Sequence, residues 1–153
     1  QFGMALSPPP EFGSVLKTVA GKMPKEAERL VRVGFDLNDA RAMESIAATS
    51  PAANVARLTR PLVIIAGAKD PMVPVAGVTS YVGQLQAAGK PVTFLLDPDE
   101  GHMPRKPVVR EAYAHLLDSL LHRYLGVEAP EAPSAELAAY LAGGAMKSNG
   151  ALP

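Results

Sequence analysis

The sequence predicts an α/β fold in which parallel strands of one sheet are flanked by helices. Two apolar runs of strand length, residues 61–67 and 92–96, are each followed by a polar loop and then by a helical pattern. Runs that are apolar at consecutive positions are typical of strands buried on both faces, as in a parallel sheet. Repetition of strand, loop and helix is the unit from which such sheets are built.

The composition indicates a globular chain and excludes several classes of partner. Its 153 residues, 48% of them hydrophobic and 20% charged, are enough for one domain with a core. The 15 basic and 15 acidic residues cancel, and the basic ones are scattered. Neither nucleic acid nor an anionic membrane is therefore an expected partner, and no apolar stretch approaches the roughly 20 residues of a membrane span. The absence of cysteine rules out disulfides, thiolate metal sites and a cysteine nucleophile.

The first fifty residues predict a loop and then two helices. Residues 7–10 read Ser-Pro-Pro-Pro, which predicts a turn or an extended loop because consecutive prolines cannot continue a helix. Pro24 begins a helical pattern with acidic residues in its first turn, and Gly34 ends it. A second helix is expected from residue 36 or 38 to residue 48, where Ser50-Pro51 stops it.

The remaining residues predict the α/β unit and then a tail. Strand 61–67 and strand 92–96 are expected to be followed by helices at about 76–88 and 107–125. From residue 127 onward Ala, Pro and Gly dominate, with one short helix at about 134–141. We therefore expect a domain over residues 1–126 and a surface tail over 127–153. Because two strands do not form a stable sheet alone, the other strands are expected outside this chain.

The opening residues are unusual for the start of a natural polypeptide. The chain begins Gln-Phe-Gly-Met-Ala-Leu, without an initiator Met and without the basic start of a signal peptide. We expect the chain to be a cut or processed product of a longer polypeptide.

Each of the two polar loops carries one side chain suited to acid–base chemistry. Asp70 lies four residues after Ala66, and His102 lies six residues after Leu96. Because the carboxyl ends of neighbouring parallel strands meet at one edge of a sheet, we expect Asp70 and His102 to meet there. An Asp that accepts a hydrogen bond from His Nδ1 leaves Nε2 free to take a proton from a serine. Taken singly, these residues are more typical of a turn and of a solvated loop, so the pattern alone supports both interpretations equally.

A longer stretch resembles the prolyl oligopeptidase family of serine peptidases. Residues 58–74 carry that family's pattern of a proline, an apolar strand, Gly-x-x-Asp and Val-Pro. Residues 84–91 are similar to its helix end and turn before the last strand, and Glu100-Gly101-His102 is similar to its histidine motif. The likeness covers about residues 50–125, whereas residues 1–49 match only loosely. The 32 residues between Asp70 and His102 fit one strand–helix–strand unit.

The resemblance implies the C-terminal portion of an α/β-hydrolase fold, with Asp70 as the acid and His102 as the base of a serine triad. The serine itself is not found, because Ser14 and Ser80 lack the flanking glycines of the G-x-S-x-G turn. We therefore expect the nucleophile on a preceding segment or a complementary N-terminal polypeptide of the same protein. Without it the chain should be inactive. The implied substrate is a short peptide, and no cofactor is implied.

Other interpretations stay open at this stage. A serine esterase would use the same fold and the same triad, and a non-catalytic interaction module could keep the hydrolase scaffold. A metal-binding face on the last long helix is less favoured than a solvated one; its members would be Glu111, His115, Asp118 and His122. A calcium loop lacks the required spacing; its members would be Asp97, Asp99 and Glu100.

Overall fold

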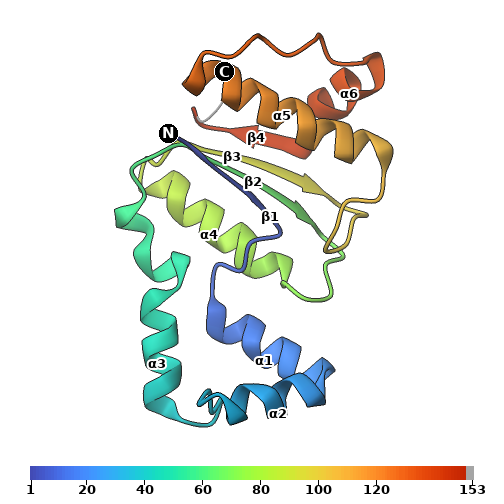
Figure 1. Cartoon of the computed structure of the whole chain (residues 1–153). Coiled ribbons are helices and arrows are strands. Elements are labelled where there is room, and N and C mark those ends of the chain that lie inside the picture. The colour runs from blue at the N-terminus through green and yellow to red at the C-terminus, as the bar shows by residue number, and fades with distance from the viewer. Residues whose placement is uncertain (151–153) are drawn as a thin grey trace.

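A computed structural model describes residues 1–150 and has a four-stranded sheet at its centre (Figure 1). Strands β2 (Leu62–Gly67) and β3 (Val92–Asp97), which the sequence predicts, lie side by side and parallel. Strand β1 (Gly3–Leu6) pairs in parallel with β2, and β4 (Met146–Ser148) pairs antiparallel with β3. The sheet is therefore mixed, since its β4 edge departs from the all-parallel arrangement expected.

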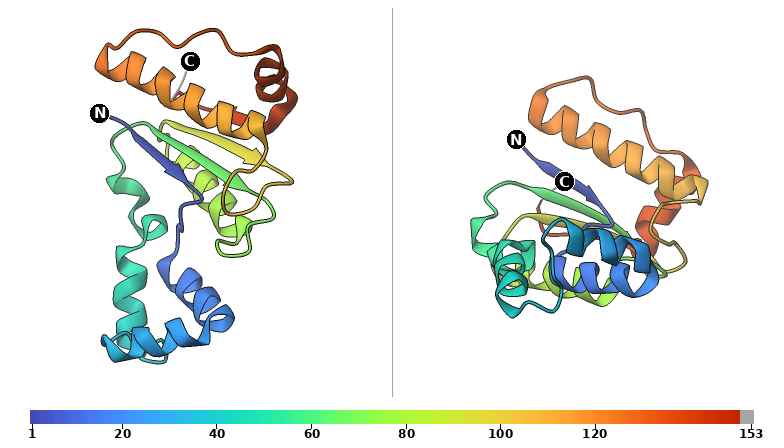
Figure 2. Two further views of the ribbon diagram at one scale, coloured as in Figure 1. Left: turned by 45° about the vertical axis from the view of Figure 1, so that its right-hand side comes forward. Right: turned by 60° about the horizontal axis from the view of Figure 1, so that its bottom comes forward.

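Helices cover both faces of the sheet (Figures 1 and 2). Helix α4 (Val75–Ala87) lies on one face and α5 (Pro107–Leu125) on the other. Successive side chains of a strand point to opposite faces, so Ile64 packs with α4 while Val63 and Ile65 pack with α5. This double burial explains why β2 is apolar at consecutive positions. The predictions of both strands and of the helix after each are confirmed.

Three helices lie on the α4 side of the sheet, at the bottom of Figure 1. They are α1 (Phe12–Lys22), α2 (Pro24–Arg32) and α3 (Ala40–Thr49), and a 3₁₀ segment, η1 (Pro51–Arg57), returns the chain to β2. Asp39 caps α3 by accepting hydrogen bonds from two backbone amides of its first turn. Helices α2 and α3 confirm the prediction.

The sequence did not predict β1 or α1. Strand β1 has only four residues, Gly-Met-Ala-Leu, and none of them is β-branched or aromatic, so its strand signal is weak. Helix α1 contains two glycines, and Glu11 at its N-terminus makes no capping hydrogen bond. Each of these features weakens a helical signal. The Ser-Pro-Pro-Pro segment at residues 7–10 does form the expected connection, between β1 and α1.

The segment expected as a surface tail packs onto the sheet at residues 135–148. Helix α6 (Ala135–Tyr140) begins at Ser134, whose hydroxyl accepts a hydrogen bond from a backbone amide. Its Leu137 is 1% exposed and belongs to the core on the α5 side. A short turn of π-helix, η2 (Leu141–Ala145), then leads into β4. No helix within residues 1–150 has the length and apolar character needed to cross a bilayer.

The burial of Leu137 predicts that the C-terminal segment contributes to stability. Leu137→Ala should lower the free energy of unfolding by about 2–5 kcal/mol, because it removes buried methyl groups and leaves a cavity. Leu125→Ala is the matched control, since Leu125 is 61% exposed, and it should change that free energy by less than about 0.5 kcal/mol. Urea unfolding followed by circular dichroism measures both. Equal effects would show that α6 does not pack on the sheet.

Candidate active site

The two side chains that the sequence places at one edge of the sheet meet there. Asp70 lies in the loop after β2, and His102 lies in the loop after β3. Nδ1 of His102 is 2.9 Å from Oδ2 of Asp70. The Asp70 side chain is 2% exposed and that of His102 is 45% exposed. The acid is therefore enclosed, while the imidazole remains open to a reacting group.

Backbone amides hold the Asp70 carboxylate in place. Its Oδ1 accepts hydrogen bonds from the amides of Met72 (2.7 Å) and Val73 (2.9 Å), which leaves Oδ2 for His102. Burial raises the pKa of Asp70, but the hydrogen bonds from Val73, His102 and Met72 together outweigh that effect and hold the pKa below its ordinary value. Asp70 is thus an ionised acceptor at neutral pH. It selects the tautomer of His102 with the proton on Nδ1, so that Nε2 carries the free lone pair.

The loops that carry the pair are joined by their backbones. The amide of Ala68 donates to the carbonyl of Asp97 (2.8 Å), and that of Lys69 donates to the carbonyl of Glu100 (2.9 Å). This contact requires a glycine at position 67, because a Cβ atom there would lie 2.2 Å from the Glu100 carbonyl oxygen. The close approach of the two loops therefore explains why the Gly-x-x-Asp pattern begins with a glycine.

Buried charge beneath the histidine loop is matched by a cation and a phenol. Asp97 is 2% exposed and accepts hydrogen bonds from Lys106 Nζ (2.9 Å) and the Tyr140 hydroxyl (3.0 Å). Burial raises the pKa of Asp97, but hydrogen bonds from the ammonium, a backbone amide and the phenol outweigh it and lower the pKa. Burial and the bond to Asp97 in turn raise the pKa of Tyr140. Asp99 also pairs with Lys106, at 3.3 Å.

The side-chain contacts in the histidine loop and on α5 also test the two metal sites considered from the sequence. Lys106 occupies the space between the Asp97 and Asp99 carboxylates that a calcium ion would need. On α5, His122 Nδ1 lies 2.7 Å from the carbonyl of Val127, at the helix end. Within residues 1–150, the structure brings together no group of three side chains able to hold a metal ion.

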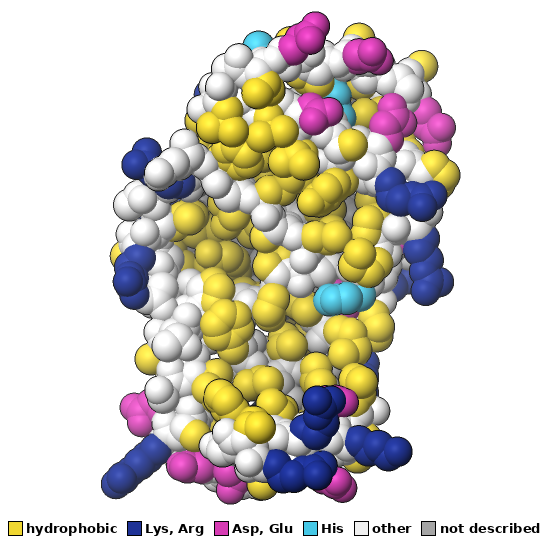
Figure 3. Space-filling view, viewed as in Figure 1, with side chains coloured by type: hydrophobic (Ala, Val, Ile, Leu, Met, Phe, Trp, Pro, Cys, Tyr) yellow, Lys and Arg dark blue, Asp and Glu magenta, His cyan; other side chains and the backbone are white. Residues whose placement is uncertain are grey.

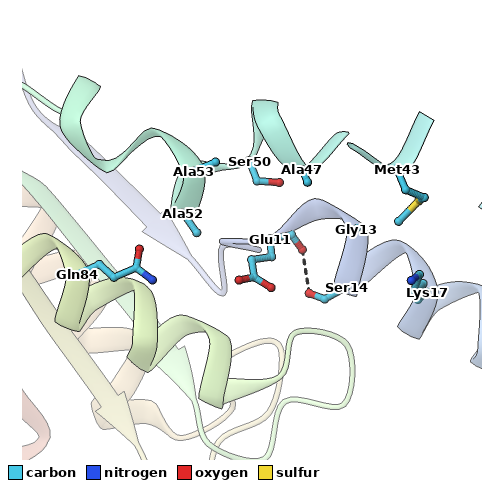
Figure 4. A pocket seen from close by; sticks show the side chains of 10 residues that line it. All are labelled: Glu11, Gly13, Ser14, Lys17, Met43, Ala47, Ser50, Ala52, Ala53 and Gln84. Carbon is cyan, nitrogen blue, oxygen red and sulfur yellow. Dashed lines mark hydrogen bonds between the residues drawn. The ribbon is translucent and has the colours of Figure 1, made fainter. Parts of the chain in front are cut away.

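Ser14, one of the serines considered as a nucleophile, lies in a different part of the molecule. It lines a cavity of about 530 Å³ between α1, α3, η1 and α4 (Figure 4). Its hydroxyl donates to the backbone carbonyl of Glu11 at 2.9 Å. The cavity beside His102, about 380 Å³, is lined by none of the same residues; its lining includes Lys69, Pro71, Met103 and Arg105.

Four side chains contact the histidine loop or its buried charge, and the sequence did not predict these contacts. The Ser7 hydroxyl donates to the His102 carbonyl at 2.9 Å, although the two residues are 95 positions apart. Glu100 accepts hydrogen bonds from two backbone amides further along the same loop. Lys106 and Tyr140 bind Asp97. Only Glu100 left a signal, as the first residue of the Glu-Gly-His motif.

Comparisons with known proteins agree on one family. Residues 18–128 match the family model described as prolyl oligopeptidase family. The chain is 40% identical over 97 residues to dipeptidyl peptidase family member 6 of Caenorhabditis elegans, and 31% identical over 125 residues to dipeptidyl aminopeptidase BIII of Pseudoxanthomonas mexicana. These alignments cover 63% and 81% of this chain, but the chain spans only 13% and 18% of the length of those relatives.

Solved structures show the same fold. The chain resembles a puromycin-hydrolysing peptidase of Mycobacterium tuberculosis with a TM-score of 0.62 and 21% sequence identity. The match covers 84% of this chain and 19% of that one. The similar solved structures are α/β hydrolases, so the predicted fold is confirmed.

The contact at Gly67 predicts a strong effect of one methyl group. Gly67→Ala should displace the histidine loop and lower the free energy of unfolding by about 1–3 kcal/mol, because the backbone must shift to accept the added atom. Gly83→Ala in α4 is the matched control, since its Cβ would meet nothing within 4 Å. That change should raise stability by about 0.5–1 kcal/mol. Thermal unfolding of both variants measures the effects, and stabilisation by both would contradict the close approach.

The lowered pKa of Asp97 predicts a pH-dependent contribution to stability. A carboxyl group whose pKa is lowered by folding stabilises the protein above its unfolded pKa of about 3.9, and that contribution is lost as the pH falls through its folded pKa. The difference in unfolding free energy between wild type and Asp97→Asn should therefore be constant from about pH 5 to 7 and shrink below about pH 4. Urea unfolding at a series of pH values measures it. A difference that stays constant at acid pH would contradict the assignment.

Proposed function

Because the chain belongs to the prolyl oligopeptidase family, we propose that it supplies the acid and the base of a serine peptidase, with Asp70 and His102 in those roles. Membership of the family supports a hydrolase. The observation that carries the proposal is the hydrogen bond between Asp70 Oδ2 and His102 Nδ1 at 2.9 Å. The accessible imidazole beside an enclosed carboxylate is the arrangement that general-base activation of a hydroxyl requires.

The proposed reaction needs two proton transfers at each stage. Nε2 of His102 takes the proton of a serine hydroxyl while the serine oxygen bonds to the peptide carbonyl carbon. The same nitrogen then gives that proton to the leaving amine as the C–N bond breaks, which leaves an acyl-enzyme ester. Water repeats the sequence and releases the acid. Asp70 holds the imidazole in its Nδ1–H tautomer and stabilises the imidazolium that forms twice in each cycle.

The serine is proposed to come from a preceding segment or a companion polypeptide of the same protein. Within residues 1–150, the hydrogen bond of the His102 ring is with Asp70 and not with a serine. The chain spans less than a fifth of its curated relatives, which leaves ample sequence for a nucleophile in a whole protein of their size.

The surface of the chain supports a covering segment beside β1. Strand β1 is the end strand of the sheet, and its outer edge is unpaired within residues 1–150. Hydrophobic side chains gather over the face that carries β1, between α5 above and the α1–α2 region below (Figure 3). An unpaired strand edge surrounded by apolar surface is normally covered in a native protein. A preceding segment that adds strands beside β1 would bury both.

A peptide is the proposed substrate, because both curated relatives are named as peptidases. A triad does not by itself choose an amide over an ester. Cleavage of an aminoacyl naphthylamide compared with a short-chain nitrophenyl ester therefore decides between peptidase and esterase. Cleavage of the ester without cleavage of the naphthylamide would support an esterase instead of a peptidase.

The assembled protein should lose activity when either member of the pair is changed. We expect Asp70→Asn and His102→Ala each to lower kcat/KM on an aminoacyl naphthylamide by about 10⁴-fold, because the serine then lacks an oriented base. His115→Ala on α5 is the matched control and should leave kcat/KM unchanged. A variant of Asp70 or His102 that keeps full activity would contradict its role.

A fluorophosphonate probe tests whether an assembled enzyme exists. Applied to material purified under native conditions, it should label a serine on the segment that completes the protein, because only an activated serine reacts with it. Intact mass spectrometry of the same sample identifies the labelled polypeptide. If no component of a folded, complete sample is labelled, the chain is a non-catalytic module on a hydrolase scaffold.

A further inference from the structure

The loop that carries His102 is closed at its base by a buried acidic side chain. Glu100 is 4% exposed, and its two carboxyl oxygens accept hydrogen bonds from the amides of Arg105 (3.0 Å) and Lys106 (2.6 Å). The residue just before the loop thus holds the residues just after it. Residues 101–104, with His102 among them, are confined to a short closed loop.

A second contact reaches the same loop from the far side of β2. Ser7 follows β1 directly, and its hydroxyl donates to the His102 carbonyl at 2.9 Å. Its amide donates to the carbonyl of Ile65 at 2.8 Å, which fixes Ser7 to β2 as well. Ser7 is buried and has a φ of +44°, the only positive φ of a non-glycine residue in residues 1–150. This conformation is costly for a residue with a Cβ atom, and here it accompanies the hydroxyl contact to His102.

The imidazole needs such support because little else encloses it. The His102 side chain is 45% exposed, so packing alone does not fix its direction. Within residues 1–150 its ring is hydrogen-bonded to Asp70 alone, and that bond keeps its geometry only if the backbone at His102 stays in place. A base must be held within a fraction of an ångström to act on its partner.

We propose that Ser7 and Glu100 are positioning residues for His102: Glu100 closes the loop, Ser7 fastens the His102 carbonyl, and together they keep Nδ1 against Asp70. The inference rests on the proposed function for its catalytic consequence. The structural part concerns this chain alone, because all four residues lie within it. Neither residue touches a substrate or the reacting atoms in the proposed mechanism.

The test is nitrogen NMR of the chain labelled with ¹⁵N-histidine, at a pH where the imidazoles are neutral. In the wild type, the ring of His102 should be mainly the Nδ1–H tautomer. In Ser7→Ala, Ser7→Gly and Glu100→Gln that majority should be lost. The signals of His115 and His122 on α5 should not move. Ser119→Ala is the matched control, because it also removes a serine hydroxyl that donates to the backbone carbonyl of a histidine. The Ser119 hydroxyl oxygen lies 2.7 Å from the carbonyl oxygen of His115.

The pair of changes at Ser7 separates the hydroxyl from the backbone conformation. Ser7→Gly relieves the positive φ and should keep the fold, whereas Ser7→Ala keeps the Cβ atom; both lack the hydroxyl. If Ser7→Gly and Glu100→Gln keep the wild-type tautomer, the inference is overturned. A shift of all three histidine signals together would also overturn it, because it would show a general effect on the fold.

Activity of the assembled protein separates this inference from the proposed function. Loss of position should lower kcat by about 10²-fold with little change in KM. A loss of the tautomer majority in a protein that no fluorophosphonate labels would uphold the positioning role and reject the peptidase. Full activity of Ser7→Gly and Glu100→Gln, alongside inactive His102→Ala, would uphold the peptidase and reject the positioning role.

Discussion

The parallel pairing of β2 with β3 is the constraint on which the rest of the structure depends. Gly67, the last residue of β2, pairs with Asp97, the last residue of β3. Because the strands end level with each other, the loops that follow begin side by side and exchange backbone hydrogen bonds. Three residues beyond Gly67 and five beyond Asp97, the carboxylate of Asp70 meets the imidazole of His102. A shift in register by one residue would turn the side chains of one strand to the opposite face and separate the loops.

The polar interior at this edge is stable because every buried acid has specific partners. Asp70 is held by two amides and an imidazole, and Asp97 by an ammonium, amides and a phenol. Glu100 is held by two amides of its own loop. Among residues 1–150, no buried side-chain nitrogen or oxygen lacks a hydrogen-bond partner. The buried acids are thus compensated by hydrogen-bond donors, and Asp97 also by the charge of Lys106.

The sequence predicts those parts of the molecule whose signal is local. Strands β2 and β3 are continuous apolar runs, and α4 and α5 follow them with apolar stripes, so their positions could be read within a few residues. Strand adjacency placed Asp70 and His102 at one edge of the sheet, and the family resemblance then assigned them as a pair. In contrast, β1 and β4 are strands of four and three residues that gain their pairing only from a neighbour distant in the chain. The contacts of Ser7 and Tyr140 with the histidine loop and with Asp97 likewise join residues 95 and 43 positions apart. No local pattern encodes such contacts.

An acid–base pair of this kind can form before its nucleophile is in place. Both members come from one strand–helix–strand unit, and the groups that hold them lie in the same chain, from Ser7 at the end of β1 to the amides of Met72 and Val73. The Asp70 carboxylate is buried and held by two backbone amides, whereas the imidazole of His102 is 45% exposed. The position of the His102 imidazole, the proposed base, is therefore set by contacts within this chain. A covering segment that brings a hydroxyl to Nε2 would have to match a position already fixed, rather than create it.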